Sequence, residues 1–221
     1  MSRFVILLDG EVVRTPRLDA QLAGARIIAA DGGMRHSAAL GVVPELWVGD
    51  FDSVPAALPA ELAAVERRRF PSDKDRTDGE LAVAEALAQG ATSLVLAGAF
   101  GGTRADHALL HLAMGIRRAK EGIEVVLTSG AQEGFPLLPG TRTFNYKDGT
   151  LFSILGFSHL SGVTVTGAKW PLDGVEVPFG SSLTVSNEVR GGLRVSFAVG
   201  RAMLIAHPYP GEGPGAIPRS S

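Results

Sequence analysis

The sequence predicts a protein that begins as an α/β domain, with a mainly parallel sheet flanked by helices, and ends as an antiparallel β domain. Three observations lead to this prediction. Strand-like and helix-like patterns alternate over the first ~128 residues, as in parallel sheets covered by helices. The helical period then disappears, and short strand patterns alternate with turn sequences. Between the two parts, Ser129–Gly140 has the Gly and Pro content of a linker or long loop.

The first part is expected to contain short strands rich in β-branched residues and leucine, as buried parallel strands are. These strands are Phe4–Leu8, Arg26–Ala30, Leu46–Val48, Arg68–Phe70, Ser93–Ala97 and Glu124–Thr128. The clearest helix is Asp78–Gln89, because Thr77 and Glu80 form a capping-box pattern at its start and Gly90 follows its end. A second helix is expected over Ala105–Lys120.

The second part is expected to form a small antiparallel β domain over residues 137–208, after an α/β domain over residues 1–130. Its candidate strands are Thr150–Leu155, Gly162–Thr166, Ser182–Val185, Leu193–Ala198 and Ala202–Ala206. Three glycine-containing segments are predicted to form hairpin turns: Lys147–Gly149, Leu172–Gly174 and Arg190–Gly192. Residues 209–221, in which Gly and Pro alternate, are expected to form an irregular tail.

The composition is that of a globular protein and narrows the classes of partner. The formal net charge of −2, from 21 basic and 23 acidic residues, gives no overall electrostatic case for nucleic acid or an anionic membrane. The absence of cysteine excludes disulfides, thiolate catalysis and Cys-based zinc sites. No apolar run approaches the ~20 residues of a membrane span, and none near the N-terminus resembles a secretion signal, so a cytoplasmic location is expected.

Aspartates are concentrated after the predicted strands. Seven of the eleven Asp residues lie in four segments of the first half: Ala30–Gly33, Gly49–Ser53, Ser72–Asp78 and Gly98–His107. Because ligands of an open parallel sheet bind outside the carboxyl ends of its strands, the fold should bring these carboxylates to one rim. Short oxygen ligands gathered at such a rim indicate a magnesium ion held for phosphate chemistry.

The segment Gly49–Ser53 supports two interpretations. Asp50 and Asp52 are two residues apart and would repel each other unless a cation lay between them. Asp and Ser in this order also form simple Asx turns, which need no metal. This segment alone leaves the two interpretations equally open.

The segment Ser72–Asp78 is stronger evidence for a metal site. Acidic side chains near a helix N-terminus are favourable by ~0.3–1 kcal/mol each, so one or two of them need no functional explanation. Here three carboxylates, Asp73, Asp75 and Asp78, alternate with Lys74 and Arg76. This mixture suits a magnesium–triphosphate complex, in which carboxylates hold the metal and cations meet phosphate oxygens.

The glycine-rich segment Gly98–Gly102 follows a predicted strand and precedes a helix, so its backbone amides are candidates to cradle phosphate. Its glycine spacing matches neither a dinucleotide fingerprint nor a P-loop. The helix start adds a phosphate donor, a further metal ligand and a candidate proton carrier, which are Arg104, Asp106 and His107. His107 and His111 have the spacing of zinc sites, but no Glu base or third ligand accompanies them, so His111 is assigned to packing or to the surface.

Taken in chain order, these segments resemble the thiamine pyrophosphokinase family. The family pattern is Asp-Gly-Gly, then Gly-Asp-x-Asp-Ser, then Asp-x-Asp-x-Thr-Asp before a helix, then Gly-Gly-Arg-x-Asp-His. The matches are Asp31–Gly33, Gly49–Ser53, Asp73–Asp78 and Arg104–His107, with further similarity at Gly167–Leu172 and Ser186–Glu188. One departure is Thr103, which separates Gly102 from Arg104 and would displace Arg104 by ~3 Å in an extended chain.

The resemblance implies an N-terminal α/β catalytic domain, a C-terminal β-sandwich, and a homodimer with active sites at the subunit interface. It also implies transfer of pyrophosphate from ATP to the hydroxyl of thiamine, with release of AMP. The expected Mg²⁺ ligands are Asp50, Asp52, Asp75 and Asp78, with Asp106 as a further candidate. The residues expected to bind the nucleotide and its phosphates are Asp31, Gly32, Gly33, Lys74, Gly101, Gly102, Arg104 and His107.

Thiamine is expected to meet Trp170, Ser186 and Asn187, with an aromatic face against the cationic thiazolium. The alternative for Trp170 is a packing role at a strand edge. In this hypothesis the thiamine hydroxyl attacks the β-phosphorus in line, and catalysis relies on positioning and charge neutralisation. Which aspartate takes the hydroxyl proton is left open.

Other functions share the acidic rim. A metal-dependent phosphohydrolase would use water in place of the thiamine hydroxyl, and a related pyrophosphokinase would use another small alcohol such as a pterin. A thiamine or nucleotide sensor without activity is the rival from a different class, although binding alone does not require so many carboxylates beside an anionic nucleotide.

Overall fold

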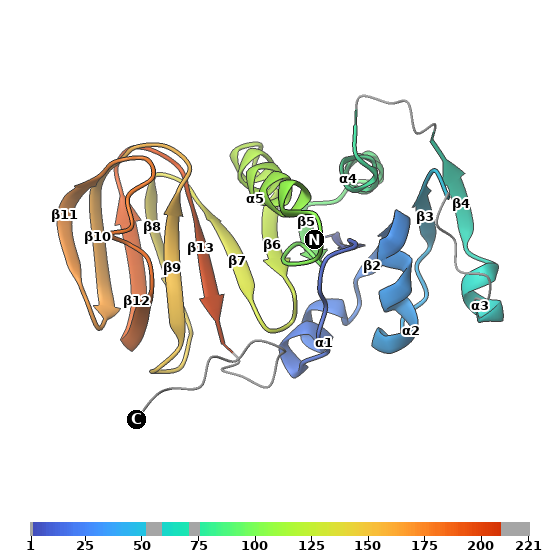
Figure 1. The fold of residues 1–221 in the computed structure, drawn as a ribbon, viewed down its shortest axis with the longest axis horizontal. Helices are drawn as coiled ribbons and strands as arrows, with labels where there is room; N and C mark the ends of the chain where they lie inside the picture. Colours follow the sequence, from blue (N-terminus) through green and yellow to red (C-terminus); the bar gives the residue numbers. More distant parts are fainter. Residues whose placement is uncertain (1, 52–58, 71–75, 209–221) are drawn as a thin grey trace. The chain divides into compact units, whose positions relative to one another are not determined.

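The computed structural model describes residues 2–51, 59–70 and 76–208 of the chain. The chain forms two compact units, and the boundary between them lies between Gly130 and Ala131. The first unit combines parallel strands with helices, and the second is built from antiparallel strands (Figure 1). The predicted fold class is therefore confirmed.

The first unit is organised around a parallel sheet whose strands follow the spatial order β6-β5-β1-β2-β3-β4. Because every pair is parallel, the carboxyl ends of all these strands point to the same edge. The strands are β1 (Arg3–Leu7), β2 (Arg26–Ala30), β3 (Leu46–Gly49), β4 (Glu66–Arg69), β5 (Ser93–Ala97) and β6 (Glu124–Thr128). Three predicted strands match β2, β5 and β6 residue for residue, and the other three differ from β1, β3 and β4 by one or two residues at one or both ends.

Helices cover this sheet. One apolar cluster joins Leu18, Leu40 and Leu62, from three short helices, to Val5 and Trp47 of the sheet. The longer helix α4 contacts β1, β2 and β3, and α5 contacts β6. The helices are α1 (Pro16–Leu22), the 3-10 helix η1 (Asp31–Arg35), α2 (His36–Leu40), α3 (Ala60–Ala63), α4 (Asp78–Ala88) and α5 (Ala105–Lys120).

The two helices predicted from the sequence, α4 and α5, are confirmed. The helices α1, η1, α2 and α3 were not predicted, because helices of one or two turns carry too few residues to show a period. No helix of the described chain is long and apolar enough to cross a bilayer.

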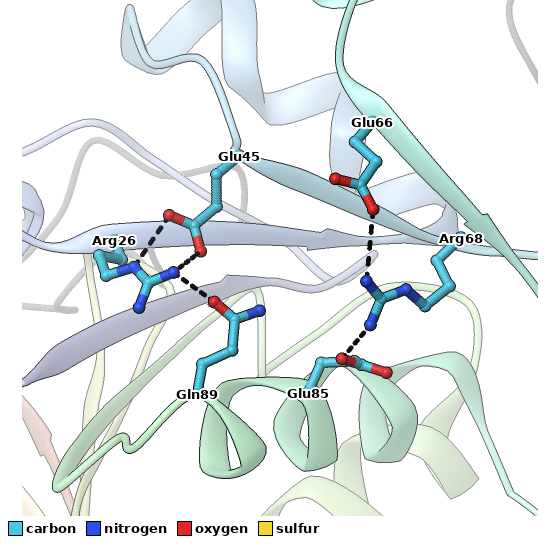
Figure 2. Close-up of polar contacts among 6 residues, drawn as sticks. All are labelled: Arg26, Glu45, Glu66, Arg68, Glu85 and Gln89. Atoms are coloured by element: carbon cyan, nitrogen blue, oxygen red, sulfur yellow. Dashed lines mark hydrogen bonds and ion pairs between the residues drawn. The ribbon is translucent and has the colours of Figure 1, made fainter.

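Polar side chains connect α4 and the residue after it, Gln89, to strands β2 and β4, as Figure 2 shows. Arg26 of β2 donates to both carboxylate oxygens of Glu45, at 3.0 and 2.7 Å, and also contacts Gln89. Arg68 of β4 contacts Glu85 of α4 and lies 3.3 Å from Glu66. Exposed ion pairs of this kind contribute only about 0–1 kcal/mol each to the free energy of folding. We therefore expect them to fix the position of α4 against the sheet more than to stabilise the unit.

The strand β4 ends the order of the sheet and, within the described residues, pairs only with β3. Its sequence is Glu66-Arg-Arg-Arg69, and three of these four residues are exposed. Such a charged strand is typical of a sheet edge.

The second unit contains two antiparallel sheets that share one strand, β12. One sheet runs β7-β13-β9-β12 and the other β11-β10-β12-β8. A single apolar cluster, which includes Phe152, Leu160, Val195 and Leu204, draws on both sheets, as in a β-sandwich. The strands are β7 (Glu133–Leu137), β8 (Gly140–Phe144), β9 (Leu151–Gly156), β10 (Leu160–Ala168), β11 (Leu172–Val177), β12 (Asn187–Phe197) and β13 (Ala202–His207).

The predicted linker Ser129–Gly140 is wrong, because it contains β7 and the first residue of β8. The glycines and prolines of this segment, among them Gly134 and Pro136, suggested a break in regular structure. In the structure Pro136 lies opposite Met203, and pairing with β13 continues on both sides of it. A proline removes only its own N–H from a ladder, so the strand persists.

The three predicted hairpin turns are also wrong. Lys147–Gly149 does contain a turn, but it joins β8 to β9, which each pair with β12 rather than with each other. Leu172–Gly174 lies in β11, where an extra residue opposite β10 forms a bulge and Gly174 has φ 62°. Arg190–Gly192 lies inside β12, between its pairing with β9 at Asn187–Glu188 and with β8 at Leu193–Phe197. Glycines that permit a bend within a strand were thus interpreted as turns between strands.

The predicted strand Ser182–Val185 is a turn in the structure. Only Thr184 makes strand-like bonds, because its carbonyl accepts from the Ile154 N–H at 2.8 Å and its hydroxyl donates to the Ile154 carbonyl at 2.6 Å. Its apolar neighbours Leu183 and Val185 are exposed rather than buried. Alternation of side chains was present in the sequence, but among the described residues no strand forms a ladder with this segment beyond the bonds of Thr184.

The cap of α1 offers a test of how the first unit is held together. Thr15 accepts from the Leu18 N–H at 3.2 Å and donates to the Gly130 carbonyl at 3.3 Å. Thr15→Ala should lower the free energy of unfolding by about 1–2 kcal/mol, because both bonds are lost from a buried position. Thr15→Ser keeps the hydroxyl and should lose much less. Urea unfolding measures both, and equal losses in the two variants would contradict the capping role.

Candidate functional site

A cavity of about 340 Å³ lies at the carboxyl ends of the parallel strands in the first unit. This size is within the range of small-ligand sites, which begins at about 300 Å³. The loops after β1, β2, β3 and β5 contribute to it, together with the amino-terminal ends of α4 and α5. Its polar and charged side chains are Asp9, Asp31, Asp50, Arg76, Thr77, Asp78, Thr103, Arg104, His107 and His111.

Asp31 shows that carboxylates converge in this cavity. Burial raises the pKa of its side chain above the ordinary value, and repulsion from Asp78, Asp50 and Asp9 raises the pKa further. A hydrogen bond with the backbone at Gly32 acts in the opposite direction and does not cancel these effects. The predicted gathering of Asp31, Asp50 and Asp78 at one rim is therefore present in the structure.

Glycines allow this close approach. A Cβ on Gly32 would lie 2.5 Å from Oδ1 of Asp9, and one on Gly49 would lie 3.2 Å from Oδ1 of Asp31. Gly33 is packed more tightly still, because its Cβ would lie 2.1 Å from the Leu7 carbonyl oxygen. Gly32 and Gly33 were predicted to seat the nucleotide. In the structure both let η1 pack against the end of β1.

The start of α4 brings an acid and a cation to the cavity. Thr77 caps the helix by accepting from the Glu80 N–H at 3.3 Å, as the capping-box pattern predicted. The first helical residue, Asp78, lines the cavity beside Arg76. The cap therefore fixes a carboxylate at the positive end of the helix dipole, where its charge is favoured.

The glycine-rich segment after β5 forms the opposite wall. Gly10 donates to the Gly98 carbonyl at 3.0 Å, and a Cβ on Gly10 would lie only 2.3 Å from that oxygen. Gly101 and Gly102 both have positive φ, 68° and 83°, and both line the cavity. Glycine adopts this conformation without strain, and the phosphate cradle expected from the sequence stays a prediction.

Arg104 and Asp106 form a bidentate ion pair at the start of α5. Nε of Arg104 lies 2.9 Å from Oδ1 of Asp106, and Nη2 lies 2.6 Å from Oδ2. The hydrogen bond from Arg104 holds the pKa of Asp106 well below its ordinary range. Arg104 lines the cavity, but Asp106 does not. Within the described residues, both carboxylate oxygens of Asp106, which was predicted as a further metal ligand, are thus hydrogen-bonded to Arg104.

The two histidines of α5 differ in environment. His107 lines the cavity, and its ring centroid lies 6.4 Å from that of His111. His111 is buried, with Nδ1 3.4 Å from the Ala99 carbonyl oxygen, and burial lowers its pKa. His111 thus packs inside the unit and also reaches the cavity wall, which the packing assignment only partly anticipated.

Asp9 and the residues that hold it were missed by the sequence analysis. Asp9 pairs with Arg35, whose Nη2 also donates to the Asp9 carbonyl at 2.6 Å, and Nε2 of His36 lies 2.9 Å from the Gly10 carbonyl oxygen. Burial lowers the pKa of His36, with a further contribution from the charge of Arg35. Asp9 follows an apolar strand just as Asp31 does, so the same rule that selected Asp31 could have found it.

Several predicted site residues lie outside the described residues, namely Asp52, Asp73, Lys74 and Asp75. Among the described residues alone, no three Asp, Glu or His side chains come close enough together to form a metal site. Asp50 and Asp78 are the two predicted metal ligands that the described chain brings to the cavity.

The predicted thiamine-binding residues lie in the second unit. Asn187 is buried and ties down the backbone of Trp170, accepting from its N–H at 3.1 Å and donating to its carbonyl at 2.8 Å. The Trp170 side chain is 54% exposed, which argues against a packing role, and Nζ of Lys169 lies 4.6 Å from its ring centroid. Ser186, with φ 61°, is held by the Ser153 hydroxyl at 3.0 Å.

The fold and this cavity define a class of protein: an α/β enzyme built to handle a phosphorylated ligand, followed by an antiparallel β unit. Two family models match the chain. The model for the thiamin pyrophosphokinase catalytic domain matches residues 22–127, and the model for the thiamin pyrophosphokinase vitamin B1 binding domain matches residues 143–204. The chain therefore belongs to the thiamin pyrophosphokinase family, and the resemblance stated from its motifs is confirmed.

Individual proteins agree with this assignment. A thiamine pyrophosphokinase of Bacillus subtilis (strain 168) is 29% identical over 182 residues, which is 80% of this chain and 84% of that protein. The crystal structure of thiamine pyrophosphokinase from Bacillus subtilis has a TM-score of 0.80 at 25% identity and covers 93% of this chain and 99% of its own. That of thiamin pyrophosphokinase from Geobacillus thermodenitrificans has a TM-score of 0.73 at 26% identity, with 94% and 97% covered.

The burial of Asp31, together with repulsion from neighbouring carboxylates, predicts a pH-dependent stability. Because the folded pKa of Asp31 is raised, its contribution to stability is fully present below the unfolded pKa of about 3.9 and is lost as the pH rises through the folded pKa. Asp31→Asn should therefore be more stable than the parent protein at pH 7 in EDTA, and the advantage should shrink toward pH 4. Urea unfolding at both pH values measures this. Asp173→Asn, at an exposed position of β11, is the control, and an Asp31→Asn protein that gains nothing at pH 7 would contradict the interpretation.

Proposed function

We propose that this chain transfers pyrophosphate from Mg-ATP to the hydroxyl of thiamine, giving thiamine diphosphate and AMP. The observation that carries the proposal is the convergence of Asp31, Asp50 and Asp78 at the carboxyl end of a parallel sheet, in a chain that matches both domains of one kinase family. ATP as co-substrate follows from the family, and the cavity offers a suitable place for its phosphates.

The residues present fit a magnesium ion. Asp50, directly after β3, and Asp78, at the start of α4, both line the cavity, and both repel the carboxylate of Asp31. A divalent cation between such carboxylates would remove that repulsion. We assign Mg²⁺ to Asp50 and Asp78 together with Asp52 and Asp75 from the flanking segments. When bound, the ion would neutralise charge on the triphosphate and orient it.

The remaining groups of the cavity would bind and orient the phosphates. Arg76 and Arg104 supply positive charge, and Lys74 is predicted to add a third cation. Arg104 can approach phosphate with the part of its guanidinium that Asp106 does not occupy, so Asp106 acts by orienting Arg104. Gly101, Gly102, His107 and Asp31 line the cavity, whereas the role of Gly32 and Gly33 in seating the nucleotide stays a prediction from the family resemblance.

The acceptor would be bound by residues of the second unit. Trp170 is exposed, and its backbone is anchored by Asn187, so the ring is held in place and free to contact a ligand. Because Lys169 lies over the ring, the cationic thiazolium of thiamine would meet the face that Lys169 leaves open. The homodimer with interface active sites and the cytoplasmic location remain predictions from the family resemblance and the composition.

The acceptor assignment is tested by AMP release. With Mg²⁺ and ATP present, adding thiamine should produce AMP and thiamine diphosphate in equal amounts, because the hydroxyl displaces AMP from the β-phosphorus. Omitting thiamine, or replacing it with a hydroxymethyl pterin, should reduce AMP release to background. If AMP were released equally fast with and without thiamine, thiamine would not be the acceptor. Release of inorganic phosphate would favour a phosphohydrolase.

The carboxylates of the cavity are tested by amide substitution. Asp50→Asn and Asp78→Asn should each lower kcat/KM by about 100-fold or more, the scale on which one preorganised charged group acts in catalysis. Excess Mg²⁺ should recover part of the loss, since affinity for the ion is weakened. Asp173→Asn, at an exposed position of the second unit, should change neither quantity. Full activity in both cavity variants would remove Asp50 and Asp78 from the site.

A further inference from the structure

Two strained backbone positions border the carboxylate cavity. Among the described residues of the first unit, the non-glycine residues with positive φ are Asp31, at 41°, and Phe51, at 63°. Asp31 directly follows β2, and Phe51 directly follows Asp50 at the end of β3. Side chains disfavour this conformation, so it persists only where the surroundings hold it, and such positions gather at functional sites.

A single side chain, the indole of Trp47, contacts both strained positions. Its Nε1–H donates to the Asp31 carbonyl at 2.9 Å, and its ring meets the Phe51 ring edge-to-face with centroids 5.0 Å apart and planes at 89°. Trp47 itself is 2% exposed and belongs to the apolar cluster beneath the sheet. The side chain that fixes the two loops is thus anchored in the core.

Two arginines of the edge strand β4 lie over the rings of Trp47 and Phe51. Cζ of Arg67, the register partner of Trp47, lies 4.9 Å from the Trp47 ring centroid and 5.7 Å from that of Phe51. Cζ of Arg69, the register partner of Gly49, lies 5.6 Å from the Phe51 ring centroid. Because Gly49 has no side chain, the Arg69 guanidinium can reach the Phe51 ring.

We propose that Trp47 and Phe51 are positioning residues for the pyrophosphate transfer, and that they set the relative placement of Asp31 and Asp50 for the metal–nucleotide complex. This proposal rests on the proposed function for the identity of the ligand. The physical basis is that one buried, rigid indole contacts both the loop that carries Asp31 and the loop that carries Asp50. Without that link, each loop would relax away from the other, and the carboxylates would no longer face a shared cation.

The test uses variants that separate strain, contact and fold. Trp47→Phe keeps an aromatic ring but loses the bond to Asp31. Phe51→Gly relieves the positive φ but loses the contact with Trp47, whereas Phe51→Leu keeps an apolar contact and the strain. Leu22→Ala, in the same apolar cluster but on α1, is the control for a loss of core packing without any contact with the rim.

The first measurement is Mn²⁺ affinity by isothermal titration in the presence of a non-hydrolysable ATP analogue and without thiamine. Trp47→Phe and Phe51→Gly should bind Mn²⁺ about 10-fold or more weakly, the scale on which loss of support behind metal ligands acts. The Mn²⁺ affinity of Phe51→Leu and Leu22→Ala should stay within about 3-fold of that of the parent protein. This should hold for Leu22→Ala even if its melting temperature is the lowest of the variants.

The second measurement is steady-state kinetics. Trp47→Phe and Phe51→Gly should lower kcat about 10-fold or more while the KM for thiamine stays within about 2-fold, because the acceptor site is untouched. Unchanged Mn²⁺ affinity and kcat in Phe51→Gly would overturn the proposal, since that variant carries no added backbone strain. If the parent protein binds Mn²⁺ but releases no AMP with thiamine, the proposed function fails while the titration still decides the positioning role.

Discussion

Repulsion between aspartate carboxylates is the constraint around which the first unit is arranged. Burial raises the pKa of Asp31, and the nearby carboxylates of Asp78, Asp50 and Asp9 raise it further, so the ionised form of Asp31 costs the fold stability. Three interactions keep the surrounding loops in place. Thr77 caps α4, Arg35 pairs with Asp9, and the indole N–H of Trp47 donates to the Asp31 carbonyl. Such an arrangement is expected where a bound cation neutralises the carboxylates and so removes their cost in stability.

Much of this arrangement could be predicted from the sequence, because its signals are local. Strands such as Arg26–Ala30 and Ser93–Ala97 are apolar runs with clear boundaries, and α4 begins with a cap that is visible in three residues. The rule that ligands bind at the carboxyl ends of parallel strands then placed Asp31, Asp50 and Asp78 together without coordinates. The family motifs added the chemistry.

What could not be predicted depends on tertiary contacts. Trp47 looks like an ordinary core residue in the sequence, and only the fold shows that its N–H meets the Asp31 carbonyl. The pairing of Arg104 with Asp106, two residues apart, was not expected for side chains assigned separate roles. In the second unit, Gly191 and Gly192 carry positive φ inside one strand, and a sequence pattern cannot distinguish such a bend from a turn.

The row of arginines on β4 has a consequence for how copies of this protein meet. In the described chain β4 has an unpaired side, and an open strand edge invites another chain to extend the sheet. An intruding copy of β4 would set guanidinium groups beside guanidinium groups, and like charges placed directly opposite each other destabilise a ladder. It would also disturb Arg67 and Arg69 on their aromatic rings. The same arginines that cover Trp47 and Phe51 therefore guard the sheet against aggregation.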